Sequence, residues 1–439
     1  MKWFDGTFVL LVVALRLASA ETANVSFAAL ACYALLGRAR AIQALLLSWL
    51  FVMLNPGISP TPSVAGVGRY GVLLCAAISV LLRSGILTRH FRMHPMTRAT
   101  MLLGGFFVFH SIATSPFVDV SVLKSASWMI ATSTLISGWH SLSVDEHKTL
   151  STQVFVGLTI LMLCSLPFLL LPQGYLVNGT GFQGVLSHPQ AFGPTMALLG
   201  AWAVGHIVGN RSETWYFTVL GATCLSLIVA SEARTAGFGL ILGCMFAVII
   251  TPLLSRSRTR VVLRGLLSRR VQILLLILLA GAAMAWPLLE SRMVQYVEKR
   301  SEADDASEAY QISRGGLIQQ MWINIQHRPL LGIGFGIASS PNQMVVEREP
   351  VLGFPVSAAI EKGVLPLAVL EEVGVIGALA VAVWLFTLLR RSASGGVITM
   401  AVVMTVLSMN MGESTLFSPG GFGLLPLALL GWAASSRSV

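Results

Sequence analysis

TQVFVGLTILMLCSLPFLLL, residues 152–171, is a run of 20 residues without a charged side chain. As a helix it would be about 30 Å long, the thickness of the hydrocarbon core of a bilayer. The rest of the chain has the same character: 55% of its 439 residues are hydrophobic, only 11% are charged, and the mean hydropathy is +0.78. A soluble domain carries roughly a quarter charged residues. The composition therefore predicts an all-α, polytopic membrane protein.

Fourteen apolar runs bounded by charges, Pro and Gly are candidate membrane helices. They lie near residues 6–20, 24–37, 41–54, 70–83, 99–115, 121–141, 152–171, 190–209, 215–230, 234–253, 271–288, 366–390, 396–410 and 420–434. Several are shorter than the roughly 20 residues that a crossing needs, so we expect about 12 to 14 transmembrane helices. The first run also has features of a cleavable signal peptide, but the apolar runs that follow it at once favour a first transmembrane helix.

The basic residues indicate an orientation. When the chain is threaded through all 14 runs from a cytoplasmic start, 18 of its 29 Lys and Arg residues lie inside, 9 lie outside and 2 lie within runs. Short basic loops remain in the cytoplasm, and six arginines between Arg256 and Arg270 form such a loop. We therefore attribute the net charge of +10 to the orientation of the protein in the membrane rather than to nucleic-acid binding. We expect both termini to be cytoplasmic.

Acidic residues gather on the opposite side, where this threading places 15 of the 19. Eleven of these lie between Glu290 and Glu372, in or beside one long external loop. The chain then divides into N-terminal helices (1–141), central helices with substrate-binding loops (142–288), a periplasmic loop (289–365) and C-terminal helices (366–439). A connection as long as this loop is usually functional, so we expect function to lie there.

Two local patterns stand out in the loop. Glu308–His327 has apolar residues near helical spacing, which predicts an amphipathic helix on the membrane surface or over a cavity. GIGFG (332–336) does not match the dinucleotide fingerprint and is read as a tight turn that returns this helix to the core. The sequence has no motif for nucleotide hydrolysis or zinc proteolysis, and its five cysteines lack the spacings of metal or redox sites.

Polar residues at the predicted external side are candidates for chemistry. They are His188, Arg234, Arg300, Arg314, His327, Arg328, Glu361, Lys362 and Glu372, with Lys124 one turn into a run. The four arginines suit a ligand with phosphates, because guanidinium groups donate in pairs and stay charged. The alternative is that such arginines only contact lipid headgroups. His188 is either a base or, beside a proline, a structural residue.

Several segments together resemble a family. They are GFQGVLSHPQAFG (181–193), SEARTAG (231–237), Arg314 placed 15 residues before Pro329 in HRPLLGIGFG, and LEEVGVIG (370–377). Their order, spacing and predicted side are similar to those of the O-antigen ligase and O-antigen polymerase superfamily of bacterial envelope glycosyltransferases. The similarity covers roughly residues 150–410.

The resemblance implies a transferase without metal or other cofactor at the periplasmic face of the inner membrane. Its donor would be a saccharide linked to undecaprenyl diphosphate, and its acceptor another lipid-linked repeat unit for a polymerase or lipid A core for a ligase. The family arginines that hold the diphosphate map onto Arg234 and Arg314. Membrane lipids and a chain-length regulator would be further partners, and nucleic acid would not be one.

Two family features are missing here. The catalytic His of the ligases falls on Gly363, and the Trp one turn after the loop arginine falls on Ile318. Glu361 and Lys362 are the nearest polar substitutes for the histidine, with Glu361 as the base, while Glu371 or Glu372 are alternatives. We therefore expect a polymerase making O-antigen or exopolysaccharide, with a ligase as the second hypothesis and a polysaccharide-lipid transporter as the third.

Overall fold

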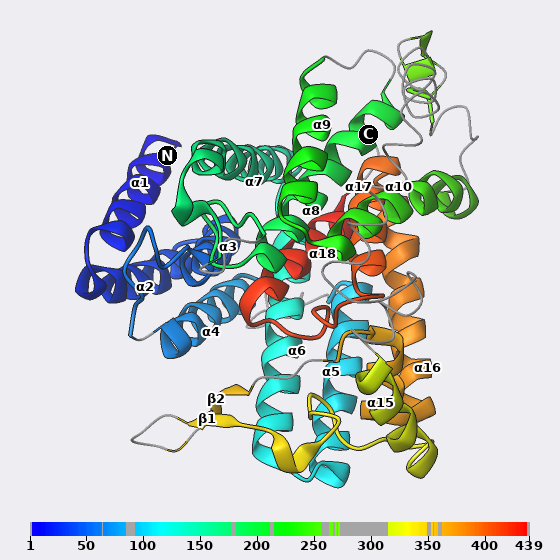
Figure 1. The fold of residues 1–439 in the computed structure, drawn as a ribbon. Coiled ribbons are helices and arrows are strands. Elements are labelled where there is room, and N and C mark those ends of the chain that lie inside the picture. Colours follow the sequence, from blue (N-terminus) through cyan, green and yellow to red (C-terminus); the bar gives the residue numbers. More distant parts are fainter. Residues whose placement is uncertain are drawn as a thin grey trace.

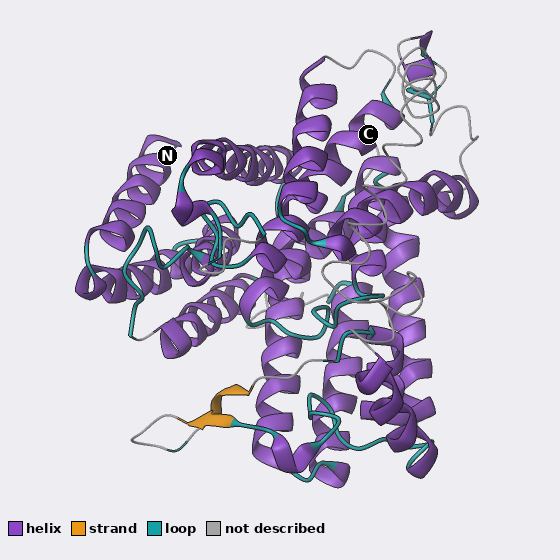
Figure 2. Ribbon diagram, in the orientation of Figure 1, coloured by secondary structure: helices purple, strands orange, loops and turns teal. Residues whose placement is uncertain are grey.

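The computed structural model describes residues 2–63, 65–84, 93–176, 181–210, 215–255, 263–266, 268–269, 271–272, 315–348, 353, 355–358 and 362–436. These residues are mostly helical (Figure 2). The helices are α1 (Lys2–Ala18), α2 (Ala20–Leu35), α3 (Arg38–Met53), α4 (Ala65–Arg83), α5 (Pro95–Thr114), α6 (Val118–His140), α7 (Val144–Ser165), α8 (Pro189–Gly209), α9 (Trp215–Ala230), α10 (Arg234–Ser255), α15 (Gly316–His327), α16 (Leu365–Ala393), α17 (Val397–Met409) and α18 (Leu424–Ser435). Strands β1 (Val346–Arg348) and β2 (Pro355–Ala358) form an antiparallel hairpin.

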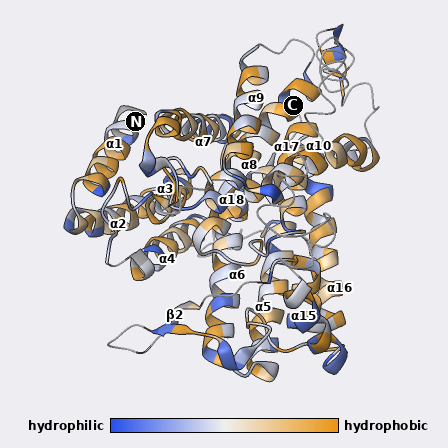
Figure 3. Ribbon diagram, in the orientation of Figure 1, coloured by the Kyte–Doolittle hydropathy of each residue, from blue (hydrophilic) through white to orange (hydrophobic). Residues whose placement is uncertain are grey.

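Within the described residues, five helical segments are long and apolar enough to cross a membrane. They are Gly66–Arg83, Val144–Leu170, Pro189–Gly209, Arg234–Ser255 and Leu365–Ala393, and shorter apolar helices include α9 and α17. The predicted class, an all-α membrane protein, is confirmed at this level. Each predicted apolar run coincides with a helix except 271–288, which lies almost entirely outside the described residues. Apolar residues dominate most of these helices (Figure 3).

The helices form three groups around α18 (Figure 1). Helices α1 to α4 pack together on one side, α8, α9, α10 and α17 on another, and α5, α6 and α16 run beside one another. The centre is aromatic: Trp128 and Trp384 are buried, and their rings lie 5.6 Å apart. The indole N–H of Trp384 donates to the Thr100 hydroxyl, which satisfies its polar atom.

Contacts between connecting segments agree with the alternation of the predicted threading. Asn55, after α3, donates to the carbonyls of Gln173 and Gly184, which lie between α7 and α8. At the other ends of the helices, Arg38 donates to the carbonyl of Ser141. Segments that the threading places on one side thus meet one another. Which side faces the cytoplasm remains a prediction.

Helix α16 is interrupted at Gly374, which has φ 64° and ψ −171°. A break in a helix leaves N–H and C=O groups without intrahelical partners. Here residues 329–334 supply them: Ile333 N–H and Gly334 N–H donate to the carbonyls of Glu371 and Glu372, and Val375 N–H donates to the carbonyl of Pro329. The break is therefore a hydrogen-bonded feature that holds the loop after α15 against α16.

The predicted tight turn at GIGFG is confirmed. Gly332, Gly334 and Gly336 all have positive φ, at 67°, 120° and 67°. Between them, Phe335 is buried and stacks on Phe107 with ring centroids 4.3 Å apart. The turn thus returns the chain to the aromatic centre.

The amphipathic helix predicted over Glu308–His327 is present from Gly316, and residues 308–314 lie outside the described part of the chain. Met321 is buried against Val364 and Ala368 near the start of α16, whereas Trp322 on the neighbouring face is 52% exposed. The apolar face of α15 therefore covers the first turns of α16.

Candidate functional site

A cavity of about 390 Å³ lies at the helix ends that the threading places outside. Its lining comes from α4, α6, the GIGFG turn, β2, the start of α16 and the loop between α17 and α18. The residues are Arg69, Tyr70, Lys124, Ser127, Phe335, Gly336, Ala358, Lys362, Gly363, Leu365, Ala368, Val369, Glu372, Glu413, Ser414, Thr415, Phe417, Ser418, Pro419, Gly420, Gly421, Phe422 and Gly423. Segments far apart in the sequence thus meet around one space with both polar and apolar lining residues.

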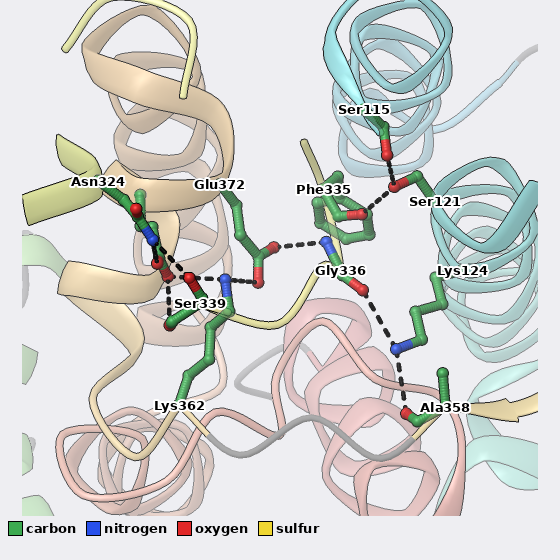
Figure 4. A network of polar contacts seen from close by, with 11 residues as sticks. Ser115, Ser121, Lys124, Asn324, Phe335, Gly336, Ser339, Ala358, Lys362 and Glu372 are labelled. Atoms are coloured by element: carbon green, nitrogen blue, oxygen red, sulfur yellow. Dashed lines mark hydrogen bonds and ion pairs between the residues drawn. The ribbon is translucent and has the colours of Figure 1, made fainter. Parts of the chain in front are cut away.

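One wall of the cavity is an ion cluster at the start of α16 (Figure 4). Lys362 Nζ lies 2.8 Å from Glu371 Oε2 and 3.0 Å from Glu372 Oε1, and the Lys362 side chain is only 1% exposed. Burying charges is costly, and such a pair persists only when its members are satisfied by further partners. Of the three, Lys362 and Glu372 line the cavity, and Glu371 lies behind them.

Besides Lys362, Glu371 has partners from α15 and from the segment after the GIGFG turn. Asn324 Nδ2 donates to Glu371 Oε1 at 2.7 Å, and the Ser339 hydroxyl donates to Oε2 at 3.0 Å. Asn324 also donates to the carbonyl of Ser339. Glu371 is fully buried, so these bonds replace its lost water. We interpret it as the structural member of the cluster.

Gly336 connects Glu372 to a second cation. Its N–H donates to Glu372 Oε2 at 2.8 Å, and its carbonyl accepts from Lys124 Nζ at 3.2 Å. Lys124 also donates to the carbonyl of Ala358 in β2. An ammonium has three N–H donors, and these carbonyls use two. Figure 4 shows Gly336 between the two charged side chains.

The hairpin that supplies Ala358 is tied to the same end of α6. Arg348 in β1 lies 2.7 Å from the carboxylate of Asp119, an ion pair with both side chains 45% exposed. A pair so exposed contributes at most about 1 kcal/mol. The pair joins β1 to the first turn of α6, beside Lys124.

Another part of the lining is the loop 413–423 between α17 and α18. It contains one carboxylate (Glu413), three hydroxyl side chains (Ser414, Thr415 and Ser418), two aromatic rings (Phe417 and Phe422) and three glycines. Asn410 Oδ1 accepts from the N–H groups of Thr415 at 2.9 Å and Leu416 at 3.0 Å. The indole N–H of Trp128 donates to the Leu416 carbonyl. The loop is therefore anchored to α17 and α6.

Of the residues predicted for the site, Lys124, Lys362 and Glu372 meet at the cavity. Glu361, Arg300 and Arg314 lie outside the described residues. The other four, His188, Arg234, His327 and Arg328, do not line the cavity. His327 is the exposed last residue of α15.

His188 is the N-cap of α8, where its Nδ1 accepts from Gln190 N–H at 3.1 Å, which matches the structural alternative. Arg234 is the first residue of α10. Its neighbour Thr235 packs against Gly412, directly before Glu413 in the cavity wall. Arg328 follows α15 and is exposed. Arg234 is thus near the cavity, and nothing brings Arg328 into it.

Sequence reasoning missed two charged residues that line the cavity, Arg69 and Glu413. Arg69 lies in α4, with its guanidinium 5.0 Å from the centre of the Tyr70 ring. In the sequence, Arg69 is one of nine basic residues that the threading places outside. Glu413 was one acidic residue in a short loop between two apolar runs. A carboxylate in MGESTLFS, beside two hydroxyl residues, is the signal that would have indicated it.

The arrangement combines fixed cations, carboxylates and aromatic rings around a space of small-ligand size. Cations can stabilise an anionic leaving group, and a carboxylate can accept a proton from a hydroxyl group.

Among the described residues, no group of three or more His, Cys, Asp and Glu is placed to hold a metal ion. Comparison with known proteins adds no family: no family model matches the chain, and no curated protein matches it significantly.

Proposed function

We propose that this protein is a bacterial inner-membrane glycosyltransferase that polymerises saccharide repeat units linked to undecaprenyl diphosphate. The product would be O-antigen or exopolysaccharide, made at the outer leaflet. The observation that carries the proposal is the cavity, in which Lys124 and Lys362 lie beside Glu372 at the helix ends predicted to be external. A saccharide bearing a diphosphate contains the groups that such a lining can bind.

In the proposed reaction, a hydroxyl of the acceptor attacks the anomeric carbon of the donor and displaces the lipid diphosphate. Lys124 and Lys362 would stabilise the charge that develops on the leaving group, since fixed cations in a partly dry site need no reorganisation during the reaction. Arg234 and Arg314 keep their predicted role on the diphosphate, and Glu361 is the predicted base.

A ligase remains the second hypothesis, because it differs only in its acceptor, the core of lipid A. One structural observation favours the third hypothesis, a transporter. Transporters place substrate sites at interrupted membrane helices, and α16 is interrupted at Gly374, two residues after Glu372. The proposal therefore needs an assay that separates transfer from transport.

The test uses purified protein in nanodiscs, incubated with lipid-linked oligosaccharide alone and then with lipid A core added. Longer lipid-linked chains without the second acceptor support a polymerase. A product that forms only with lipid A core means a ligase, and no product in either reaction contradicts a transferase. Lys124→Met should reduce transfer by at least tenfold, and Lys148→Met, at an exposed position on α7, serves as the matched control.

A further inference from the structure

We propose that a groove between α1, α3 and α7 binds one acyl chain of a membrane phospholipid. These helices lie near one another (Figure 1), and the groove between them has a volume of about 470 Å³. Among the described residues, it shares no lining residue with the cavity at Lys124. The inference goes beyond the proposed function, because it assigns a ligand to a part of the membrane region that the reaction does not use.

The groove changes from polar to apolar along each of the three helices. Asp5 on α1, Gln43 on α3 and Gln153 on α7 all lie near the ends that the threading places inside, here called the inner ends. Beyond them, every lining residue of these helices is aliphatic, glycine or Trp49. From Gln43 to Leu50 the wall on α3 rises about 10 Å. This gradient matches an amphiphile whose polar part lies at the inner ends.

Hydrogen bonds close the polar end of the groove. Gln43 Nε2 donates to Gln153 Oε1 at 2.9 Å, and Gln43 Oε1 accepts from the Tyr33 hydroxyl at 2.8 Å. Asp5 is neutralised by Arg40, at 2.8 Å. The Nε2 group of Gln153 meets no acceptor among the residues that the structure describes. Because this group carries two N–H donors, it can bind an ester or phosphate oxygen of a lipid.

The groove is too small for a transmembrane helix of another protein. One helical turn is 5.4 Å long and 10–12 Å across with its side chains, which is roughly 400–600 Å³. The groove therefore has space for about one turn, and the bond between Gln43 and Gln153 crosses its inner end. A hydrocarbon chain is narrower and fits between the same walls. Leu10 in the lining is 71% exposed, so a chain can enter from the surrounding bilayer.

Two glycines widen the groove. Gly6 on α1 and Gly157 on α7 both line it, and a Cβ at either position would meet nothing within 4 Å. An apolar space that stays empty loses contacts and costs stability, whereas a lipid chain fills it. A larger side chain at Gly157 would occupy the same space without displacing the backbone.

The side on which the polar end lies indicates which lipid binds. The diphosphate of a lipid-linked donor belongs at the candidate cavity, at the helix ends predicted to be external. The polar end of the groove lies at the opposite, inner ends of α1, α3 and α7. Under the predicted orientation, lipids with headgroups on that side are phospholipids of the cytoplasmic leaflet. The ligand is therefore a phospholipid and not the lipid carrier.

The first experiment measures fluorescence quenching in nanodiscs of phosphatidylglycerol with brominated acyl chains. Trp49 lines the groove and is only 4% exposed, so a bromine in the groove lies closer to it than one in the surrounding bilayer. These chains should quench wild type more strongly than Trp49→Phe. Gly157→Leu, which fills the groove, should lose the same part of the quenching.

Gly105→Leu on α5 is the matched control and should behave like wild type, because a Cβ there also meets nothing within 4 Å. Equal quenching of wild type and Trp49→Phe, or of wild type and Gly157→Leu, would overturn the proposal.

The second experiment measures thermal unfolding in detergent with added lipid, since a ligand that binds only the folded state raises the midpoint. Phosphatidylglycerol should raise the midpoint of wild type and Gly105→Leu more than that of Gly157→Leu. Undecaprenyl phosphate should shift wild type and Gly157→Leu equally. Equal shifts by phosphatidylglycerol in all three proteins would refute the groove, and a shift by undecaprenyl phosphate that only Gly157→Leu loses would assign it to the lipid carrier. Neither readout involves transfer, so failure of the proposed function leaves this test intact.

Discussion

The ammonium group of Lys362 lies 2.8 Å from the carboxylate of Glu371, and the two side chains are 1% and 0% exposed. Lys362 stands three residues before α16, and Glu371 lies in its second turn. The pair therefore fixes the direction from which the chain enters the helix. It also places Glu372, the next residue, at the cavity.

Lys362→Met should destabilise the protein strongly. The substitution leaves two carboxylates beside each other without their cation, and breaking a buried pair typically costs about 3–5 kcal/mol. The unfolding midpoint in detergent should fall clearly, and the double variant Lys362→Met/Glu371→Gln should recover part of the loss. A midpoint equal to that of wild type would mean that the pair contributes nothing.

Gly374→Ala should damage the break in α16. The position has φ 64°, and an added Cβ would overlap the carbonyl of Leu330. Backbone strain of this kind costs on the order of 1–3 kcal/mol before the steric overlap is counted. Gly157→Ala is the matched control, because a Cβ there meets nothing within 4 Å. Thermal unfolding compares the two variants, and similar midpoints would contradict this account.

Arg234→Lys should lower transfer activity by at least tenfold while the protein inserts normally. Lysine keeps the charge but loses the two parallel donors that bind a phosphate group. The same substitution at Arg314 tests the second predicted diphosphate ligand, and a transfer assay measures both. Full activity in both variants would mean that these arginines only contact lipid headgroups.

Cysteines introduced at Ser301 and Ser340 should react with a membrane-impermeant thiol reagent in intact cells. This result follows from the external loop 289–365, which the distribution of Lys and Arg predicts. A cysteine at Lys148, on the predicted cytoplasmic side, should react only after lysis. The reverse pattern would invert the topology and place the cavity on the cytoplasmic face.

Helix positions were largely predictable because apolar periodicity and length are local properties. The run predicted at 215–230 is α9, residue for residue, and the run at 190–209 differs from α8 by one residue. The interruption of α16 was not predicted. LEEVGVIG reads as continuous helix, and only the distant residues 329–334, which bind its free backbone groups, make a break at Gly374 stable.

The site was predictable in part. Lys124 was named because charges within apolar runs are unusual, and Glu372 because it lies at the predicted external side. Both side chains form hydrogen bonds with Gly336, because the GIGFG turn packs between α6 and α16. The spacing of residues in the sequence does not predict this packing. Glu413 and Arg69 were missed because each stands alone in its segment, and their relation to the site exists only once α4, α17 and α18 are packed.

The interruption of α16 has a consequence for the order of assembly. Residues 329–334 leave the ribosome before α16 does, so the partners for its unpaired groups already exist when that helix is made. When α16 enters the lipid bilayer, residues 329–334 can therefore form hydrogen bonds with the backbone groups freed at Gly374. These groups then need no water molecules as partners inside the membrane. Deleting the upstream turn would leave the helix unable to insert in its native shape, even though every residue of α16 itself would be intact.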